Sequence, residues 1–257
     1  DTDLDGIPDA IDPNPTVNAV VADPDGNNNL PASLATGLTG RWDCETLTSF
    51  GGTSHGFVDL SGNDHPLKHA ALGLSLDTAG MISKGVKFDA DGDYMSAPGS
   101  LVSGLSSFSV SMWVKLNQGS IQNKPDNIHT SLFSFNTALD TYPEFTLSLY
   151  KSAAGSPTQK ISFVRSIGTS LSVAWAGELP QSSWIDDGRW RHIALVKNGN
   201  NFRLFVDGVK IKDINYTLGA FTSTANGYLC FGKTVPVAGV IGTTLKGSME
   251  RLRFCSS

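Results

Sequence analysis

The first twelve residues carry carboxylates at alternate positions, a pattern that favours a metal-binding loop. A hard cation such as calcium takes about six to eight oxygen ligands, so a short loop must fold back around the ion. Gly6 permits the sharp turn, and Ile7 would supply a backbone carbonyl. The side-chain ligands would be Asp1, Asp3, Asp5, Asp9 and Asp12. We therefore predict a calcium site in this loop, with an acidic, solvated chain end as the alternative.

The residues that follow the loop decide which kind of calcium motif it resembles. Pro13 and Pro15 forbid a helix directly after it, and Asp12 stands where an EF-hand loop has a bidentate Glu. The segment is therefore more similar to a thrombospondin type 3 repeat than to an EF-hand.

Charge is unevenly distributed along the chain of 257 residues, whose formal net charge is −5. Residues 1–40 hold seven Asp and no Lys or Arg, whereas the rest holds 17 acidic and 19 basic residues. Because Lys and Arg form no run, we expect no nucleic-acid partner. No apolar stretch approaches the roughly 18 residues that span a bilayer, so we expect no membrane insertion. Since the chain begins inside a motif, we expect a piece of a longer secreted or cell-surface protein with other domains.

From Gly37 onward, short segments of alternating apolar and polar residues are separated by turn signals. This alternation is typical of half-buried strands, and Asp207-Gly208 is a strong two-residue hairpin signal. The expected strands are 108–116, 145–150, 161–164, 171–175, 190–197, 202–206, 209–211 and 248–254. Because no helical pattern interrupts them, we predict an all-β, antiparallel two-sheet jelly-roll sandwich at residues 37–257. Residues 1–36 are predicted to be a calcium-binding linker.

Several segments, in the right order, resemble motifs of laminin-G-like (concanavalin A-like) jelly-roll domains. They are Trp42–Glu45 with Asp59–Asn63, Gly85–Asp89 with Asp91–Tyr94, Phe108–Lys115, Trp190–Val196 with Leu204–Gly208, and Gly247–Phe254. The resemblance covers about residues 38–257 and implies the same sandwich.

Catalytic chemistry on such a jelly roll would need groups that we do not recognise here. A retaining glycosidase needs two carboxyl groups about 5–5.5 Å apart, and no Glu-x-Asp-x-x-Glu occurs in the chain. Lyases on jelly rolls typically pair Tyr with His. The candidates by residue type are His129, Tyr142, Tyr150 and Arg165, none in a recognisable lyase motif. We assign no catalytic residue and keep a polysaccharide lyase or hydrolase as an alternative.

The resemblance also implies a second, structural calcium that ties the first strand of the sandwich to the last. Its candidate ligands are Glu45, Asp59 and Glu250, with ordinary surface carboxylates as the alternative.

The three cysteines allow at most one internal disulfide. If the first and last strands pair, Cys44 and Cys255 could form it, and a bond from Cys230 to either is left open.

Carbohydrate binding on β-sandwiches sets aromatic faces against sugar rings. Trp175, Trp184 and Tyr142 stand outside the core pattern and are the candidate ligand platforms, although aromatic residues are more often buried. We therefore predict a secreted, non-catalytic, calcium-stabilised module of a larger extracellular protein. It would bind a polysaccharide or other glycan, or a surface partner. A structural spacer or adhesin module is the third hypothesis.

Overall fold

The computed structural model describes most of the chain from residue 37 onward. The described residues are 37–51, 54–69, 75–82, 84–90, 92–121, 128–136, 143–151, 159–167, 170–180, 184–217, 227–232, 241–243 and 245–256. Residues 1–36 lie outside them, so the division into linker and jelly roll stays a prediction.

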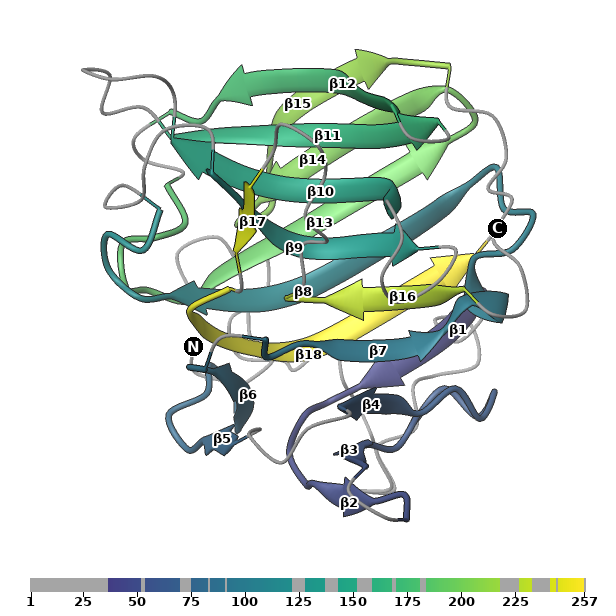
Figure 1. The fold of residues 1–257 in the computed structure, drawn as a ribbon, viewed down its shortest axis with the longest axis vertical. Coiled ribbons are helices and arrows are strands. Elements are labelled where there is room, and N and C mark those ends of the chain that lie inside the picture. Colours follow the sequence, from purple (N-terminus) through teal and green to yellow (C-terminus); the bar gives the residue numbers. More distant parts are fainter. Residues whose placement is uncertain are drawn as a thin grey trace, which may run out of the picture. The chain divides into compact units, whose positions relative to one another are not determined.

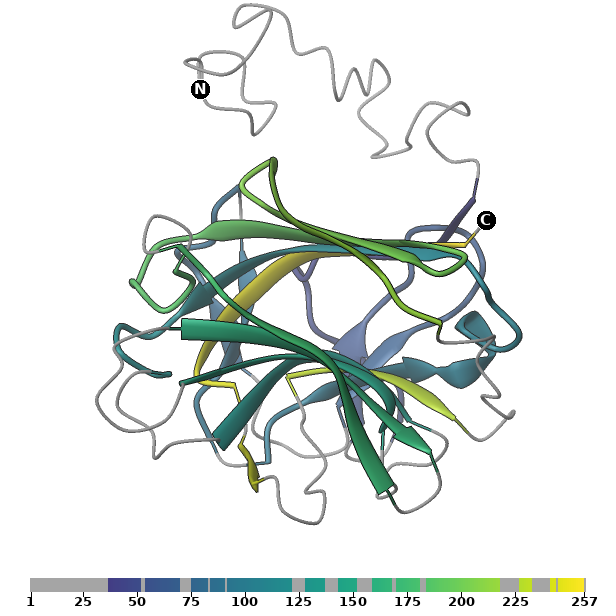
Figure 2. The same cartoon turned by 90° about the horizontal axis from the view of Figure 1, so that it is seen from above.

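Two β-sheets stack face to face, as the two layers in Figure 2 show. One sheet has eight strands in the order β15–β14–β13–β8–β18–β6–β5, and β1 also pairs with β18. Its strands are β1 (Leu38–Trp42), β5 (Ser75–Asp77), β6 (Gly85–Phe88), β8 (Phe108–Leu116), β13 (Arg191–Asn198), β14 (Asn201–Val206), β15 (Val209–Asn215) and β18 (Gly247–Ser256).

The second sheet has ten strands, and Figure 1 looks onto it. Its order is β12–β11–β10–β9–β16–β7–β4–β3–β2, and β17 also pairs with β9. Its strands are β2 (Thr48–Ser49), β3 (His55–Phe57), β4 (Leu67–His69), β7 (Met95–Pro98), β9 (Ile128–Asn136), β10 (Pro143–Lys151), β11 (Gln159–Ile167), β12 (Ser170–Glu178), β16 (Tyr228–Phe231) and β17 (Ile241–Thr243). A single 3-10 turn, η1 (Gly99–Leu101), is the helical element of the described residues.

The predicted two-sheet antiparallel sandwich is confirmed, and several local predictions hold with it. The strand expected at 108–116 is β8, with the same bounds. Asp207 and Gly208 connect β14 to β15 with φ values of 50° and 76°, the left-handed conformation that a tight hairpin turn needs. The last strand, β18, lies between β8 and β6, next to neighbours from the first half of the chain.

Phenylalanines from both sheets meet between the layers. Phe108 of β8 packs against Phe135 of β9 with ring centroids 5.2 Å apart, and it stacks on Phe254 of β18 at 5.7 Å. Phe145 of β10 stacks on Phe202 of β14 at 5.9 Å. All five side chains are almost completely buried. The Phe108–Phe135 and Phe145–Phe202 contacts join the two sheets, so they hold the two layers together, whereas Phe108 and Phe254 belong to the same sheet.

Truncation of a ring in this inter-sheet cluster should be costly. We expect Phe135→Ala to lower the free energy of unfolding by about 3–5 kcal/mol, because it removes buried apolar surface and leaves a cavity. Phe205→Ala is the matched control, since that ring lies on the half-buried outer side of β14. Chemical denaturation would measure both variants, and equal losses would contradict this account of the core.

Candidate functional site

The side of the ten-stranded sheet that faces away from the core is polar. On β10, Phe145, Leu147 and Leu149 belong to the core, so strand alternation turns Thr146, Ser148 and Tyr150 to the opposite side. The same alternation applies to β11 and β16, and to Ser134 and Asn136 of β9. On β9 a register shift between Leu147 and Ser148 brings Ser131 opposite Ser148, so Ser131 and His129 lie on the same side. We call the resulting set the polar face: His129, Ser131, Ser134, Asn136, Thr146, Ser148, Tyr150, Ser162 and Tyr228.

Strand register aligns the polar face in rows that cross the strands. Ser148 stands opposite Ser131 of β9 and opposite Ser162 of β11. Ser134 stands opposite Thr146 of β10. On its other side, Ser134 stands opposite Cys230, and Asn136 stands opposite Tyr228 of β16. Residues far apart in sequence thus line one side of the sheet, where all members except Tyr150 and Tyr228 are at most 6 % exposed.

A hydrogen-bonded network occupies one end of the polar face. The Nδ1 atom of His129 lies 2.9 Å from the hydroxyl oxygen of Ser148, which lies 2.9 Å from the hydroxyl of Ser162. The His129 ring stacks on the Tyr150 ring, with centroids 4.4 Å apart and planes 15° from parallel. Burial lowers the pKa of His129 to about 4, so the imidazole is neutral at physiological pH.

Two buried polar atoms of the polar face have no hydrogen-bonding partner within the part of the chain that the structure describes. They are the hydroxyl oxygen of Thr146 and the side-chain oxygen of Asn136, whose residues are 3 % and 1 % exposed. The amide nitrogen of Asn136 donates to the Ser134 hydroxyl at 3.0 Å. Leaving such an atom unsatisfied costs about 1–3 kcal/mol. A ligand hydroxyl that bonded to these atoms would recover part of that cost.

The geometry suits binding better than proton transfer. The structure brings together two of the four residues considered for a lyase, His129 and Tyr150. Their rings lie nearly parallel, an arrangement typical of stacking. Burial also raises the pKa of Tyr150, whereas a tyrosine base needs a lowered one.

The aromatic residues predicted from the sequence as ligand platforms do not coincide with the polar face where they can be placed. Trp184 is half-buried against the core, and its indole N–H donates to the carbonyl of Leu179 at 3.2 Å. Trp175 lies in β12 opposite Phe163, but its side chain is outside the described part of the structure, as is all of Tyr142. Their role as ligand platforms stays a prediction.

The carboxylates proposed for the second calcium each have protein partners. Glu45 accepts a hydrogen bond from Arg251 at 2.9 Å. The fully buried Glu250 accepts bonds from the backbone N–H groups of residues 81 and 82, at 2.6 Å and 3.2 Å. Asp59 accepts bonds from the backbone N–H groups of Arg41 and Ser61. No group of three or more metal-ligating side chains gathers among the described residues.

The calcium site at Glu45, Asp59 and Glu250 therefore stays a prediction. The aspartate loop from Asp1 to Asp12, with Ile7, lies outside the described residues.

The cysteines are free thiols in the structure. Cys44 and Cys230 are buried, and burial raises the pKa of Cys44 well above its usual value. Cys255 is partly exposed on β18.

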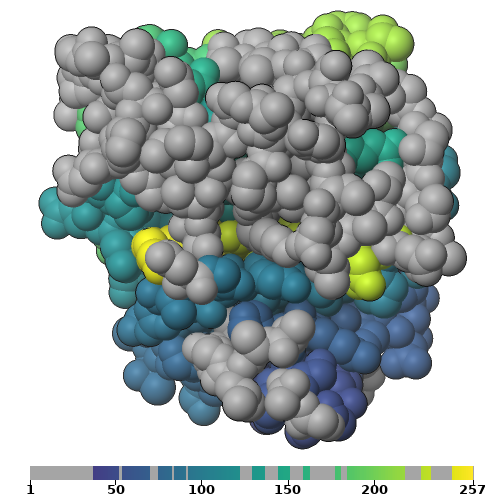
Figure 3. All heavy atoms as spheres, viewed as in Figure 1, coloured from purple at the N-terminus to yellow at the C-terminus, as the bar shows by residue number. Residues whose placement is uncertain are grey.

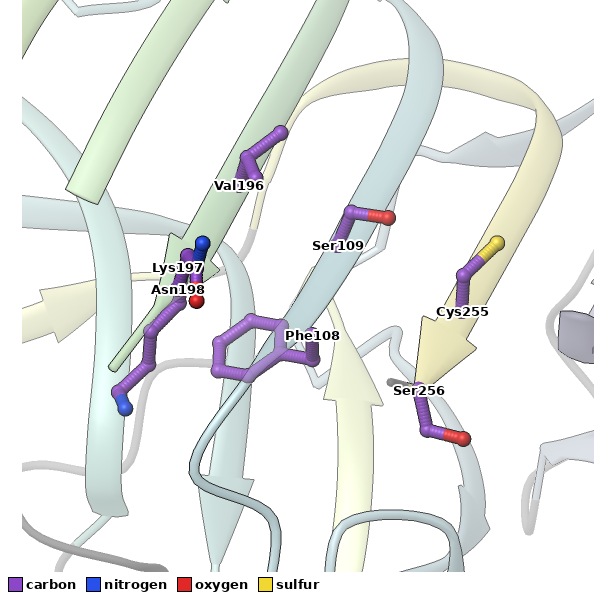
Figure 4. A pocket seen from close by; sticks show the side chains of 7 residues that line it. All are labelled: Phe108, Ser109, Val196, Lys197, Asn198, Cys255 and Ser256. Carbon is purple, nitrogen blue, oxygen red and sulfur yellow. The ribbon is translucent and has the colours of Figure 1, made fainter. Parts of the chain in front are cut away.

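A shallow pocket lies on the outer side of the eight-stranded sheet, where β8, β13 and β18 meet (Figure 4). Its lining residues are Phe108, Ser109, Val196, Lys197, Asn198, Cys255 and Ser256. The Lys197 ammonium group donates to the backbone carbonyls of Ser106 and Gly199.

The sequence named His129 and Tyr150 only as lyase candidates and did not predict that they join the other residues of the polar face. The alternation of Thr146, Ser148 and Tyr150 with apolar residues was visible, but it marked only a strand. His129 and Ser162 join them through inter-strand register, which the sequence does not display. The available signal was the choice of hydroxyl side chains on the polar side of neighbouring strands.

Comparison with known proteins shows which superfamily the fold belongs to. Residues 89–257 match the family model of the concanavalin A-like lectin/glucanases superfamily. The chain belongs to this superfamily. The laminin-G-like resemblance is thereby confirmed for the fold, whereas the thrombospondin-like repeat stays a prediction. No curated protein sequence matches this superfamily member.

Solved structures similar to this superfamily member share its fold at low sequence identity. The binding domain of Paraclostridial Mosquitocidal Protein 1 has a TM-score of 0.61 and 18 % identity, covering 87 % of this chain and 49 % of that one. Domain 4 of AbnA, a GH43 extracellular arabinanase from Geobacillus stearothermophilus, was solved in complex with arabinotriose. It has a TM-score of 0.54 and 20 % sequence identity, and the match covers 86 % of this chain and 92 % of that one. The botulinum neurotoxin serotype D/C binding domain has a TM-score of 0.59 and 13 % sequence identity, and the match covers 85 % of this chain and 48 % of that one. The chain thus spans about half the length of the two toxin domains.

Acid should destabilise the protein through His129. Its folded-state pKa is about 4 against 6.5 for an ordinary histidine, so the unfolded chain binds more protons between these values. Stability is therefore retained above pH 6.5 and falls as the pH drops towards 4, with a slope of up to about 1.4 kcal/mol per pH unit from this group.

Denaturation at pH 4.5, 5.5, 6.5 and 7.5 (about one-unit steps across the titration) would measure this slope for wild type and His129→Asn. The variant should show a shallower dependence. His192, whose pKa burial also lowers, remains in both proteins and accounts for residual slope. Identical slopes would show that His129 does not titrate as described.

Proposed function

We propose that the chain is a non-catalytic carbohydrate-binding module of a larger extracellular protein, with the polar face as its glycan site. The observation that carries the proposal is the pair of buried oxygens of Thr146 and Asn136, which have no hydrogen-bonding partner among the residues that the structure describes. A sandwich built only for stability would place apolar side chains there, because unsatisfied polar atoms oppose folding. Sugar hydroxyls supply the donors that these two oxygens lack.

Two further observations support a sugar ligand. The stacked rings of Tyr150 and His129 offer an aromatic surface with polar edges, which suits a sugar ring. Among the similar folds, AbnA domain 4 was solved in complex with arabinotriose, and the two toxin domains are named binding domains.

Among the described residues, no helix has the length and apolar character that a membrane span requires.

We also propose that calcium stabilises the protein through the aspartate loop of residues 1–12. Five aspartates with Gly6 at loop spacing support this proposal. One bound calcium ion would offset two of the seven negative charges of residues 1–40.

Thr146→Val should separate binding from folding. The substitution removes a hydroxyl that has no protein partner among the described residues, so we expect the melting temperature to stay the same or rise. Glycan affinity should fall about fivefold, the equivalent of one neutral hydrogen bond of about 1 kcal/mol. Native gel electrophoresis through arabinan, xylan, mannan and β-glucan would first find the retarding polymer and then compare variants.

Ser111→Ala, on the outer side of the eight-stranded sheet, is the matched control and should bind like wild type. Wild-type affinity in Thr146→Val would refute the assignment of the site. A folded protein that no polymer retards would refute carbohydrate binding and favour the spacer hypothesis.

Removal of calcium should lower the unfolding temperature, because an ion that binds only the folded state stabilises that state by mass action. Thermal melts in calcium, in EDTA and after calcium is restored would measure the effect. A variant with Asp3 and Asp5 changed to Asn should lose the response. An unchanged melt in EDTA would contradict the stabilising role and leave residues 1–12 as an acidic segment.

A further inference from the structure

We propose that Asn215 is an N-glycosylation site, modified when the chain is exported through a membrane that carries an oligosaccharyltransferase. This inference rests on the extracellular location contained in the proposed function and is independent of the polar face. The attached group is an oligosaccharide, joined through its first sugar to the side-chain amide nitrogen of Asn215.

The end of β15 carries an acceptor motif for this modification. Asn215, Tyr216 and Thr217 form an Asn-x-Thr triplet, the sequence that oligosaccharyltransferases modify when the middle residue is not proline. The other such triplet in the chain, at residues 14–16, has proline in the middle. Asp213 adds an acidic residue two positions before the asparagine, which one class of oligosaccharyltransferase requires. The segment therefore satisfies both the relaxed and the strict form of the motif.

The fold places this motif where a sugar chain has room. Asn215 is the last residue of β15, and both Asn215 and Thr217 are exposed. β15 is the outermost strand of its sheet, so none of the strands that the structure describes pairs with its outer edge. In Figure 3, light-green atoms of the segment that contains β15 reach the surface at the upper edge of the view. A glycan on Asn215 therefore displaces no part of the core.

Contacts around the motif indicate that the transfer precedes the folding of this strand. The backbone N–H of Tyr216 donates to the carbonyl of Asn200 at 2.7 Å, and the Tyr216 side chain packs against the core. Asp213 accepts hydrogen bonds from the Asn201 amide at 2.9 Å and from Lys210 at 3.0 Å. These contacts hold the motif in place, so a transferase must read it before β15 pairs with β14.

The reaction moves a sugar chain from a lipid-linked pyrophosphate to the protein. The amide nitrogen of Asn215 forms a bond to carbon 1 of the first sugar, while the bond from that carbon to the pyrophosphate oxygen breaks. The lipid pyrophosphate leaves with the bonding electron pair, and the amide nitrogen gives up one proton to a base of the transferase. The protein gains one bulky, hydrophilic group on its surface.

The test uses the whole protein as its own cells secrete it. Trypsin cuts after Lys212 and after Lys233, so a single peptide, residues 213–233, contains Asn215. Mass spectrometry of this peptide should find an added mass that fragments into sugar units and is attached at Asn215. A peptide found in the unmodified form alone would overturn the proposal.

Variants secreted by the same cells test the motif. Asn215→Gln and Thr217→Val should lose the added mass completely, whereas Thr217→Ser should retain it because the hydroxyl is preserved. Asn198→Gln is the matched control and should stay modified at Asn215, since Asn198 is an exposed strand end outside any such triplet. Modification that persists in Thr217→Val would overturn the assignment. The wild-type spectrum decides the question even where a variant fails to fold.

Asp213→Asn distinguishes two classes of transferase. Loss of the glycan would assign the class that requires the acidic residue, and a retained glycan would assign the class that reads the triplet alone. Both results support modification at Asn215.

An unmodified Asn215 in a secreted protein that still binds a polysaccharide would overturn this inference and leave the proposed function standing. Absence of the protein from the extracellular fraction would overturn the extracellular location and this inference with it.

Discussion

Contact between phenylalanines of the two sheets is the constraint on which the rest of the structure depends. Phe135 and Phe145 on β9 and β10 must point inward to reach Phe108, Phe202 and Phe254 on the other sheet. In a strand, successive side chains point to opposite faces, so inward aromatics leave the alternate positions pointing outward. On β10 and at Ser134 and Asn136 of β9, the polar face is the other half of the pattern that builds the core, whereas His129 and Ser131 join it through the register shift between Leu147 and Ser148. Its orientation therefore depends on the core rather than on local hydrogen bonds.

The polar face also opposes stability to some extent. Burial of a hydroxyl costs little when it bonds to another hydroxyl, as Ser148 and Ser162 do. His129 stays neutral because its burial disfavours the charged form. Thr146 and Asn136 retain oxygens without partners among the described residues. Sites that bind ligands commonly keep such imperfections, because groups satisfied within the protein have nothing left to offer a ligand.

Elements that depend on neighbouring residues could be predicted from the sequence, whereas contacts between residues far apart in the chain could not. The strand at Phe108–Leu116 and the hairpin at Asp207-Gly208 depend on neighbours in sequence, and both were predicted correctly. Proposing Glu45 and Glu250 as ligands of one ion required knowledge of their contacts. In the structure, Glu45 accepts a hydrogen bond from Arg251, and Glu250 accepts one from the backbone N–H of Met81, which is far away in sequence. Spacing along the chain does not reveal such contacts.

By itself, the sequence determined the fold class and the positions of eight of the eighteen strands that the structure describes, and it supports the prediction of a calcium loop at residues 1–12. These follow from alternation, turn residues and ligand spacing, which are local properties of a chain. Only the tertiary structure decided that His129, Ser148, Ser162 and Tyr150 form one surface, because inter-strand register brings together residues from three strands. Register depends on how the two sheets pack as a whole, and a one-residue shift would turn every one of these side chains into the core.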